Sequence, residues 1–361
     1  MPTREGVGTN AADIEVRAIA APHERPRGTR VSEEHPAQAI LSLSTAYWAS
    51  RCLHLVADVG IADALGDDPL PASALAAKTG TNPDALHRVL RALANHGIFT
   101  LKDGRFSHNP ASRLLRSDNP ASMRSLARMM GLNFHWDVFR ELGHSLKSGM
   151  SAADKAVSGG LFEHLRAHPE DGRIFNEAMV GKSFGQIGPL LGAYDFTGFK
   201  TIGDIGGGVG HLLAAILNTA PAANGVLFEL PNVIAQAKST PNPRITYVAG
   251  DFFKDSIPPC DLYVMMTVIH DWSDADSIAI LKNLRAHAPA GARLLLAEAV
   301  IDESARGSFP VDLDIEMLVF ASGRERTESQ WRGLLDKAGF KLVRAMPLAG
   351  ITGLIEAVIA P

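Results

Sequence analysis

A glycine cluster follows an acidic residue at the end of a short apolar stretch. Glycines occupy Gly206, Gly207, Gly208 and Gly210, and Asp204 lies two residues ahead of the first of them. Glycine lets the backbone turn tightly and approach a ligand closely. The nicotinamide fingerprint G-x-G-x-x-G would need a glycine at position 211, where this chain has His211. The acid and the altered spacing favour a cationic ligand without a pyrophosphate, and we predict S-adenosylmethionine (SAM).

Acidic and aromatic residues end the next two predicted strands. Glu229 stands 19 positions after Gly210, where a carboxylate can accept both ribose hydroxyls or simply end a solvated strand. The pair Gly250–Asp251, which alone would indicate only a turn, could contact the adenine amino group while the ring of Phe252 packs on the adenine. The predicted contacts of ribose and adenine are Glu229, Leu230, Gly250, Asp251, Phe252 and Phe253.

A histidine and two acids could act on a proton. His270 closes the fourth predicted strand, and imidazole titrates near neutrality, so it could take the proton of a phenol. Glu298 follows four apolar residues, where a carboxylate is costly unless it has a partner. Either Glu298 or Glu325 could hydrogen-bond the His270 ring and fix its tautomer. The sequence equally allows Glu325 to form a surface ion pair with Arg324 or Arg326.

These residues fall on a regular alternation of strands and helices in the C-terminal half. Strands are predicted at 201–205, 225–229, 244–248, 262–266, 293–299, 341–346 and 351–358, with helices between most of them. The pattern predicts an α/β fold, a doubly wound Rossmann-like sheet with ligands at the carboxyl ends of its strands. The last helix-strand-strand unit predicts an antiparallel edge.

The N-terminal half is predicted to be helical. Apolar residues recur at helical spacing over 36–65, and we expect this helix to pack against a second subunit rather than in the chain's own core. A helix-turn-helix rhythm followed by a hairpin at Asp103–Gly104 predicts a winged helix over 70–118. The expected organisation is a disordered tail (1–35), a winged-helix dimerisation domain (36–120), a helical linker (121–190) and a SAM-binding domain (191–361).

Several large apolar side chains could line an acceptor cleft between the domains, although a core role explains each one equally well. Methionine and aromatic side chains adapt well to a flat apolar substrate. The candidates are Trp136, Phe139, Phe162, Met179, Met317 and Phe320.

Composition narrows the class of protein. The chain has 361 residues, is 46% hydrophobic and carries a net charge of −4, which is typical of a globular protein that does not bind nucleic acid. Its predicted winged helix is nearly neutral, with seven basic and six acidic residues over 61–118, so counterion release would contribute little to DNA binding. Two distant cysteines favour a reducing compartment. We expect a cytoplasmic protein without metal ligands, a signal peptide or a membrane span.

From residue 36 to the C-terminus the chain resembles the class I small-molecule O-methyltransferases of the caffeate, isoflavone and acetylserotonin type. The resemblance rests on the glycine motif and on the segments 228–231, 250–253, 270–272 and 323–327. It implies that His270 is the general base between Glu298 and Glu325, and that Trp272 stacks near the adenine. It also implies that Phe175, Met179 and Ser183 touch the cofactor or the substrate, and that the chain forms a homodimer.

The sequence departs from the plant pattern at two positions. Glu229 replaces the usual aspartate, and Met266 stands where plant members often carry a lysine that contacts the cofactor. The resemblance implies methylation of an aromatic hydroxyl, leaving S-adenosylhomocysteine (SAH). Hydroxylation or decarboxylation on the same scaffold, and DNA binding by a non-enzymatic regulator, remain alternatives.

Overall fold

The computed structural model describes residues 35–157, 159–321 and 323–360. Nearly all of the predicted tail therefore lies outside the described residues. The chain groups into two compact units, 1–47 and 48–361. The finer division at 121 and 191 stays a prediction.

The first helices differ from the prediction in one respect. α1 (Pro36–Val59) ends before Gly60, and α2 (Ile61–Leu65) follows, whereas the sequence predicted one helix over 36–65. Gly60 has φ +77°, a left-handed conformation that ends the hydrogen-bond ladder of α1. The position therefore separates a long helix from a short buried one.

A small winged-helix unit follows. It comprises β1 (Leu70–Pro71), α3 (Ala72–Thr79), α4 (Pro83–Asn95), β2 (Thr100–Lys102), β3 (Arg105–Ser107) and α5 (Pro110–Arg113), with the strands in the order β1-β3-β2. The Asn82 side chain caps α4 by accepting from two backbone N–H groups. Asp103 and Gly104 both have positive φ, as a tight hairpin turn requires.

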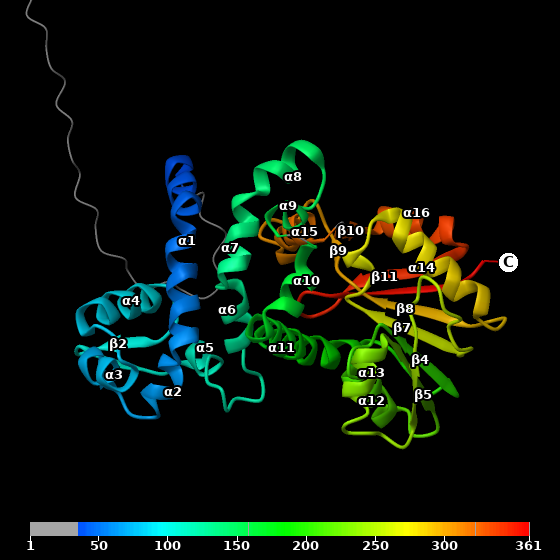
Figure 1. The fold of residues 1–361 in the computed structure, drawn as a ribbon, viewed down its shortest axis with the longest axis horizontal. Helices are drawn as coiled ribbons and strands as arrows, with labels where there is room; N and C mark the ends of the chain where they lie inside the picture. The colour runs from blue at the N-terminus through cyan, green and yellow to red at the C-terminus, as the bar shows by residue number, and fades with distance from the viewer. Residues whose placement is uncertain (1–34, 158, 322, 361) are drawn as a thin grey trace, which may run out of the picture. The chain divides into compact units, whose positions relative to one another are not determined.

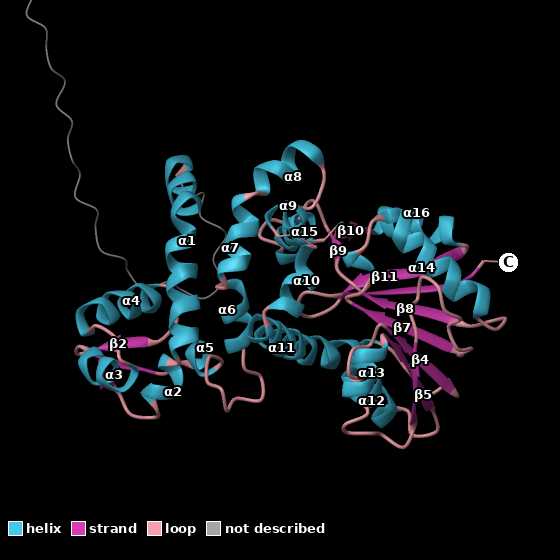
Figure 2. Ribbon diagram, in the orientation of Figure 1, coloured by secondary structure: helices cyan, strands magenta, loops and turns pink. Residues whose placement is uncertain are grey.

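Six helices lead to the second half of the chain, as Figures 1 and 2 show: α6 (Arg124–Met130), α7 (Asn133–Arg140), α8 (Leu142–Ser148), α9 (Ala152–Ala156), α10 (Gly160–Ala167) and α11 (Pro169–Ala193). α11 packs along α6 and ends against the sheet domain, where Ile187 and Leu190 join the core. One long helix therefore connects the linker to the sheet.

The C-terminal half is a seven-stranded sheet in the order β11-β12-β8-β7-β4-β5-β6. Its strands are β4 (Thr201–Ile205), β5 (Asn224–Glu229), β6 (Ile245–Ala249), β7 (Leu262–Met266), β8 (Arg293–Ala297), β11 (Phe340–Pro347) and β12 (Gly353–Ile359). The first five are parallel, and β12 runs antiparallel to both β8 and β11. The α/β prediction and its antiparallel edge are confirmed.

Helices cover both faces of the sheet (Figure 1). α14 (Asp274–His287) and α16 (Glu328–Ala338) pack on one face, while α12 (His211–Thr219), α13 (Pro231–Ala237) and the end of α11 pack on the other. The remaining elements are the 3₁₀ turn η1 (Ile269–Asp271), β9 (Val300–Ile301), α15 (Phe309–Phe320) and β10 (Arg326–Thr327). In the part of the chain described here, no helix is both long and apolar enough to cross a bilayer.

Candidate active site

His270 lies on η1, just beyond the carboxyl end of β7, and only 4% of it is exposed. Its Nδ1 is 2.7 Å from Glu325 Oε1. A carboxylate can only accept, so Nδ1 donates to Glu325 and Nε2 remains able to take a proton. This is the arrangement that a general base requires.

Glu325 is the acid that orients the imidazole. It is 2% exposed, and its own backbone N–H donates to Asp314 Oδ1 on α15 at 2.7 Å. A surface ion pair with Arg324 or Arg326 does not fit this structure, because Glu325 is buried and Arg326 instead pairs with Asp274. Glu325 rather than Glu298 hydrogen-bonds the His270 ring, and its part in catalysis stays a prediction.

Glu298 holds the loop that carries His270 rather than the ring itself. Its Oε1 accepts the backbone N–H groups of Val268 and Ile269 at 2.9 and 2.7 Å, while its Oε2 is 3.9 Å from His270 Nδ1. The loop leaves β7 at Thr267, whose φ of +51° is uncommon for a β-branched residue. Glu298 thus fixes a strained turn and adds negative charge near the base.

A two-residue parallel ladder brings the two acids together. β9 pairs with β10, so Val300 lies opposite Arg326 and Ile301 opposite Thr327. Glu298 stands two residues before β9, and Glu325 stands immediately before β10. The pairing accounts for the approach of two acids that are far apart in the sequence.

Asp271 lies on the other side of the imidazole. Its Oδ1 is 3.5 Å from His270 Nε2, and its side chain is 42% exposed. The Glu325 side chain at the opposite ring nitrogen is buried. Nε2, the nitrogen that can accept a proton, is therefore the one nearer to solvent.

The acids decide the charge of His270. Burial alone lowers the pKa of an imidazole, but Glu298, Asp271 and Glu325 outweigh burial and raise the pKa of His270 to about 9. In the free protein the ring is therefore mostly protonated at neutral pH. For the Glu298 carboxyl, burial acts in the opposite direction and raises the pKa, while the positive charge of His270 opposes that shift.

Arg326 and Gly323 hold the loop that carries His270 against the loop that carries Glu325. Arg326 is fully buried, donates to Asp274 Oδ1 at 2.8 Å and also donates to the backbone oxygens of Ile269 and Trp272. A Cβ at Gly323 would lie 1.9 Å from the His270 carbonyl oxygen. Only glycine allows that approach, so the close contact defines where Glu325 meets the ring.

The glycine loop has the backbone that its sequence predicts. Gly206, Gly208 and Gly210 have φ of +72°, +58° and +87°. Gly207 is also required, because a Cβ there would lie 2.3 Å from the Asp204 carboxyl group. The loop therefore crosses directly over Asp204 at the carboxyl end of β4.

Asp204 is a buried carboxyl group without a positively charged partner among the described residues. It is 1% exposed, and neither carboxyl oxygen accepts a hydrogen bond from the described residues. Burial and the nearby Glu229 raise the pKa of Asp204 to about 7, and the backbone amide of Leu213 opposes them. A cationic ligand would stabilise such a carboxylate, so the loop fits SAM better than an anionic nucleotide.

Glu229 and Gly250 shape the next part of this edge. Glu229 accepts the N–H groups of Gly208 and Leu230 at 3.1 and 2.7 Å, so it is tied to the glycine loop. A Cβ at Gly250 would lie 2.5 Å from the Phe228 ring. Asp251 accepts from the Phe253 N–H, which lowers the pKa of Asp251.

Phe252, Phe253 and Trp272 form an aromatic cluster beside the loop. The ring centroids of Phe252 and Phe253 lie 5.8 and 4.8 Å from that of Trp272, both edge to face. Phe252 also lies next to Gly206, within 3.7 Å of a Cβ built there. The structure thus brings these three predicted adenine neighbours together at the glycine loop.

The predicted residues of α11 lie apart from that cluster. Phe175 and Met179 pack against the apolar cluster that Met129 and Ile174 help to form, and the Ser183 hydroxyl donates to the Met179 carbonyl. Their roles toward cofactor or substrate stay predictions.

The predicted pocket residues divide into two groups. Phe139 and Phe320 lie 5.9 Å apart between α7 and α15, and Met317 lies on α15. Trp136 instead stacks under Arg51 of α1 at 5.6 Å, with its Nε1 buried and without a partner in the described part of the chain. The side chain of Phe162 lies outside that part.

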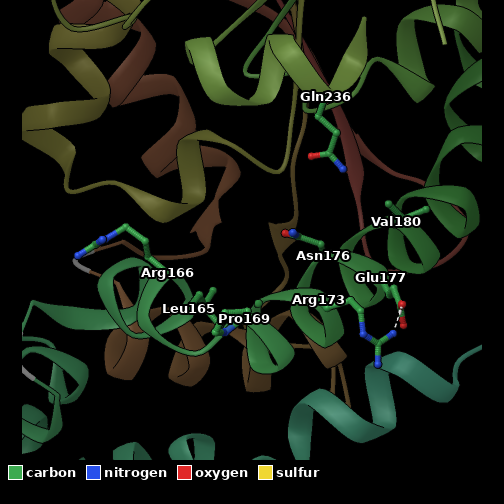
Figure 3. Close-up of a pocket in the computed structure, with 9 residues that line it drawn as sticks. Leu165, Arg166, Pro169, Arg173, Asn176, Glu177, Val180 and Gln236 are labelled. Carbon is green, nitrogen blue, oxygen red and sulfur yellow. Dashed lines mark hydrogen bonds and ion pairs between the residues drawn. The ribbon is translucent and has the colours of Figure 1, made fainter. Parts of the chain in front are cut away.

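A separate cavity of about 640 Å³ opens between α10, α11 and α13 (Figure 3). Its lining is Leu165, Arg166, Pro169, Gly172, Arg173, Asn176, Glu177, Val180 and Gln236. Arg173 pairs with Glu177 inside it, as Figure 3 shows. None of the residues around His270 lines this cavity.

Comparison with known proteins agrees with this geometry. An O-methyltransferase domain model matches residues 139–341, and an O-methyltransferase dimerisation domain model matches 41–118. The chain belongs to the O-methyltransferase family. It is a SAM-dependent methyltransferase, as the glycine loop and the base predicted.

Relatives and solved structures align over most of the chain. The phenazine O-methyltransferase PhzM of Lysobacter antibioticus is 39% identical over 88% of this chain and 95% of its own length. The mitomycin biosynthesis 6-O-methyltransferase of Streptomyces lavendulae is 33% identical over 86% and 90%. The structure of CalO1, a methyltransferase in calicheamicin biosynthesis solved with SAH, has a TM-score of 0.83 at 31% identity and covers 91% of this chain and all of that one.

Sequence reasoning missed several residues that shape the site. Asp271 could have been noticed because it adjoins His270. Asp314, Gly323 and Arg326 act through contacts that no spacing reveals.

Proposed function

We propose that the protein methylates a hydroxyl group on a flat aromatic small molecule, with His270 as the general base. The hydrogen bond between His270 Nδ1 and Glu325 carries this proposal, because it leaves Nε2 facing the accessible side of the ring. The aromatic side chains between α7 and α15 supply a surface against which a planar acceptor can pack.

Bound SAM would supply the methyl group on a sulfonium, a strong electrophile. Asp204 and Glu229 would hold its cationic and ribose parts, and Phe252, Phe253 and Trp272 would flank its adenine. His270 Nε2 takes the acceptor's hydroxyl proton. Glu325 keeps the ring oriented and, as a positioning residue, stabilises the imidazolium. Glu298 and Arg326 hold the loop in place.

Relatives support the aromatic acceptor. One is named 3-amino-4-hydroxybenzoate 4-O-methyltransferase, and another structure contains 2-hydroxy-5-methyl naphthoic acid beside SAM. A further relative, 34% identical over 92% of this chain, is an 8-amino-8-demethylriboflavin N,N-dimethyltransferase. An amine is therefore the second acceptor class to test.

Replacement of His270 tests the proposal. His270→Ala should lower turnover on a panel of naphthols and hydroxyphenazines by about 10²- to 10⁴-fold, because proton transfer loses its base. Calorimetric binding of SAH should stay within twofold, and His287→Ala on α14 serves as the control. Near-normal turnover of phenols by His270→Ala would remove this residue from the role. Methyl transfer only to the matched arylamines would show that the protein methylates amines instead of hydroxyl groups.

We also infer that the chain forms a homodimer through α1. Seven large apolar residues of this helix are exposed: Ile40, Leu41, Leu43, Tyr47, Trp48, Leu55 and Val59. The dimerisation model covers the same helix. A second copy of the chain would remove this apolar surface from water.

A further inference from the structure

Two polar side chains face each other beside the aromatic residues of α7 and α15 without bonding. His135 Nε2 on α7 lies 3.7 Å from Glu316 Oε2 on α15, too far for a good hydrogen bond. The two side chains are only 12% and 19% exposed. Burying polar groups without a hydrogen bond is costly, so the pair has bonding capacity that the described protein does not use.

Lys182 extends this polar region from α11. In the described part of the chain it makes no hydrogen bond or ion pair, and its side chain is partly buried. It is nevertheless close enough to lower the pKa of both Glu316 and Asp271. The ammonium group therefore lies in reach of the His270 side of the site and of α15, without a direct counterion.

Gln186 is a second observation on the same helix. It stands four residues after Lys182, on the same side of α11, and is 4% exposed. Neither its amide nitrogen nor its amide oxygen has a partner among the described residues. Buried amides are normally bonded, so this side of α11 is built to meet a polar ligand.

The aromatic surface beside these groups is suited to a ring. The His135 imidazole stacks on Phe139 at 5.1 Å and lies 4.7 Å from the Phe320 ring centroid. A planar acceptor packed there would place a substituent next to His135 and Glu316, within the electrostatic reach of Lys182.

We propose that Lys182, with Glu316 and His135 beside it, binds a carboxylate substituent of the aromatic acceptor. The proposal rests on the proposed function and names the acceptor class as hydroxyarenecarboxylates. It adds a specificity site to the methyl-transfer site around His270.

The charges of the neighbours favour this ligand. Burial raises the pKa of Glu316 to about 7, Lys182 opposing that shift, so below neutrality Glu316 can donate a hydrogen bond to a carboxylate. Burial, aided by His54, lowers the pKa of His135 to about 4, which keeps the imidazole neutral. Lys182 supplies the ammonium group of the set, and an ammonium–carboxylate bond is among the stronger hydrogen bonds in proteins.

The test compares 3-hydroxy-2-naphthoate with 3-hydroxy-2-naphthamide, which has the same shape and no charge. The ratio of kcat/KM for acid over amide is measured at pH 6.5 for the wild type, Lys182→Met and Lys182→Arg. Lys337→Met, at an exposed position of α16, makes the same charge change away from the site and should leave the ratio unchanged. Calorimetric binding of both probes in the presence of SAH gives the same ratio without turnover.

We expect the wild type to prefer the acid at least tenfold, and Lys182→Met to bring the ratio close to one, mainly by raising KM for the acid. Lys182→Arg should retain part of the preference. An equal response of wild type to both probes, or an unchanged ratio in Lys182→Met, overturns the inference. If both probes are methylated equally well, the inference about Lys182 is wrong but the proposed methyl transfer stands. If the acid binds selectively and neither probe is methylated, the proposed methyl transfer is contradicted but the inference about Lys182 is not.

Discussion

At His270, the negative charges that make the imidazole a strong base also keep it protonated in the free protein. Because its pKa is raised to about 9, the ring is mostly protonated at neutral pH. An acceptor that binds as its phenolate places its negative oxygen next to the imidazolium. This is the same distribution of charge that proton transfer from a neutral phenol to a neutral imidazole would produce.

Glu325→Gln tests how the acids tune this residue. The amide keeps the size of the side chain but removes a charge that raises the pKa of His270, so the pKa falls. At saturating SAM, the ascending limb of kcat/KM for the acceptor should move to lower pH, and the plateau should drop on the order of a hundredfold. Glu328→Gln, an exposed change three residues away, is the control. An unmoved limb would show that Glu325 does not set the basicity of His270.

Asp204→Asn tests the unneutralised carboxylate under the glycine loop. The folded pKa of about 7 exceeds the usual 3.8, so the folded state binds its proton more tightly and loses stability as pH rises between these values. The variant should raise the free energy of unfolding at pH 8 by up to about 4 kcal/mol, and by less at pH 5. SAH should bind more weakly to the same variant.

Urea unfolding at both pH values and calorimetry with SAH measure these two effects, with the exposed Asp336→Asn as control. A loss of stability at pH 8 would contradict the argument, because it would mean that protein groups already stabilise the charged form of Asp204.

At the scale of elements, the close packing of two loops governs the site. Gly323→Ala would place a methyl group against the His270 carbonyl, forcing η1 away from the Glu325 loop. We expect a stability loss of about 2 kcal/mol and a loss of activity. Gly333→Ala is a matched control, because a Cβ there meets nothing and removing a mid-helix glycine from α16 should stabilise by up to ~1 kcal/mol. Equal behaviour of the two variants in urea unfolding would refute this account.

The sequence predicts elements better than contacts. Strands such as β4 and β7 are continuous apolar runs bounded by turn residues, so local patterning is enough to find them. Gly60 was missed as a break because a glycine inside a helical pattern can be tolerated. The place of His270 at a strand end could be predicted, although its role as the base stays a prediction, whereas the contacts of Asp314 and Arg326 arise through tertiary packing.

At the scale of the whole molecule, assembly depends on the exposed face of α1. Leu43→Asp, at a residue that is 81% exposed, should weaken the dimer by introducing a charge into the apolar contact. Sedimentation velocity across a range of protein concentrations should show a shift toward the monomer. Leu146→Asp on α8, an equally exposed leucine, is the control. A wild type that sediments as a monomer at all concentrations would disprove the dimer itself.

The β9–β10 ladder has a consequence for how such enzymes can diversify. It fastens together the two ends of the segment 302–325, and that segment contains α15 with Glu316, Met317 and Phe320. Substitutions in α15 can therefore change the wall of the proposed acceptor site while the ladder keeps Glu298 and Glu325 in register with His270. The fold therefore keeps the residues proposed for methyl transfer apart from those that would select the acceptor. Related enzymes can thus gain new acceptors through changes in α15 while His270 and its two acids stay in place.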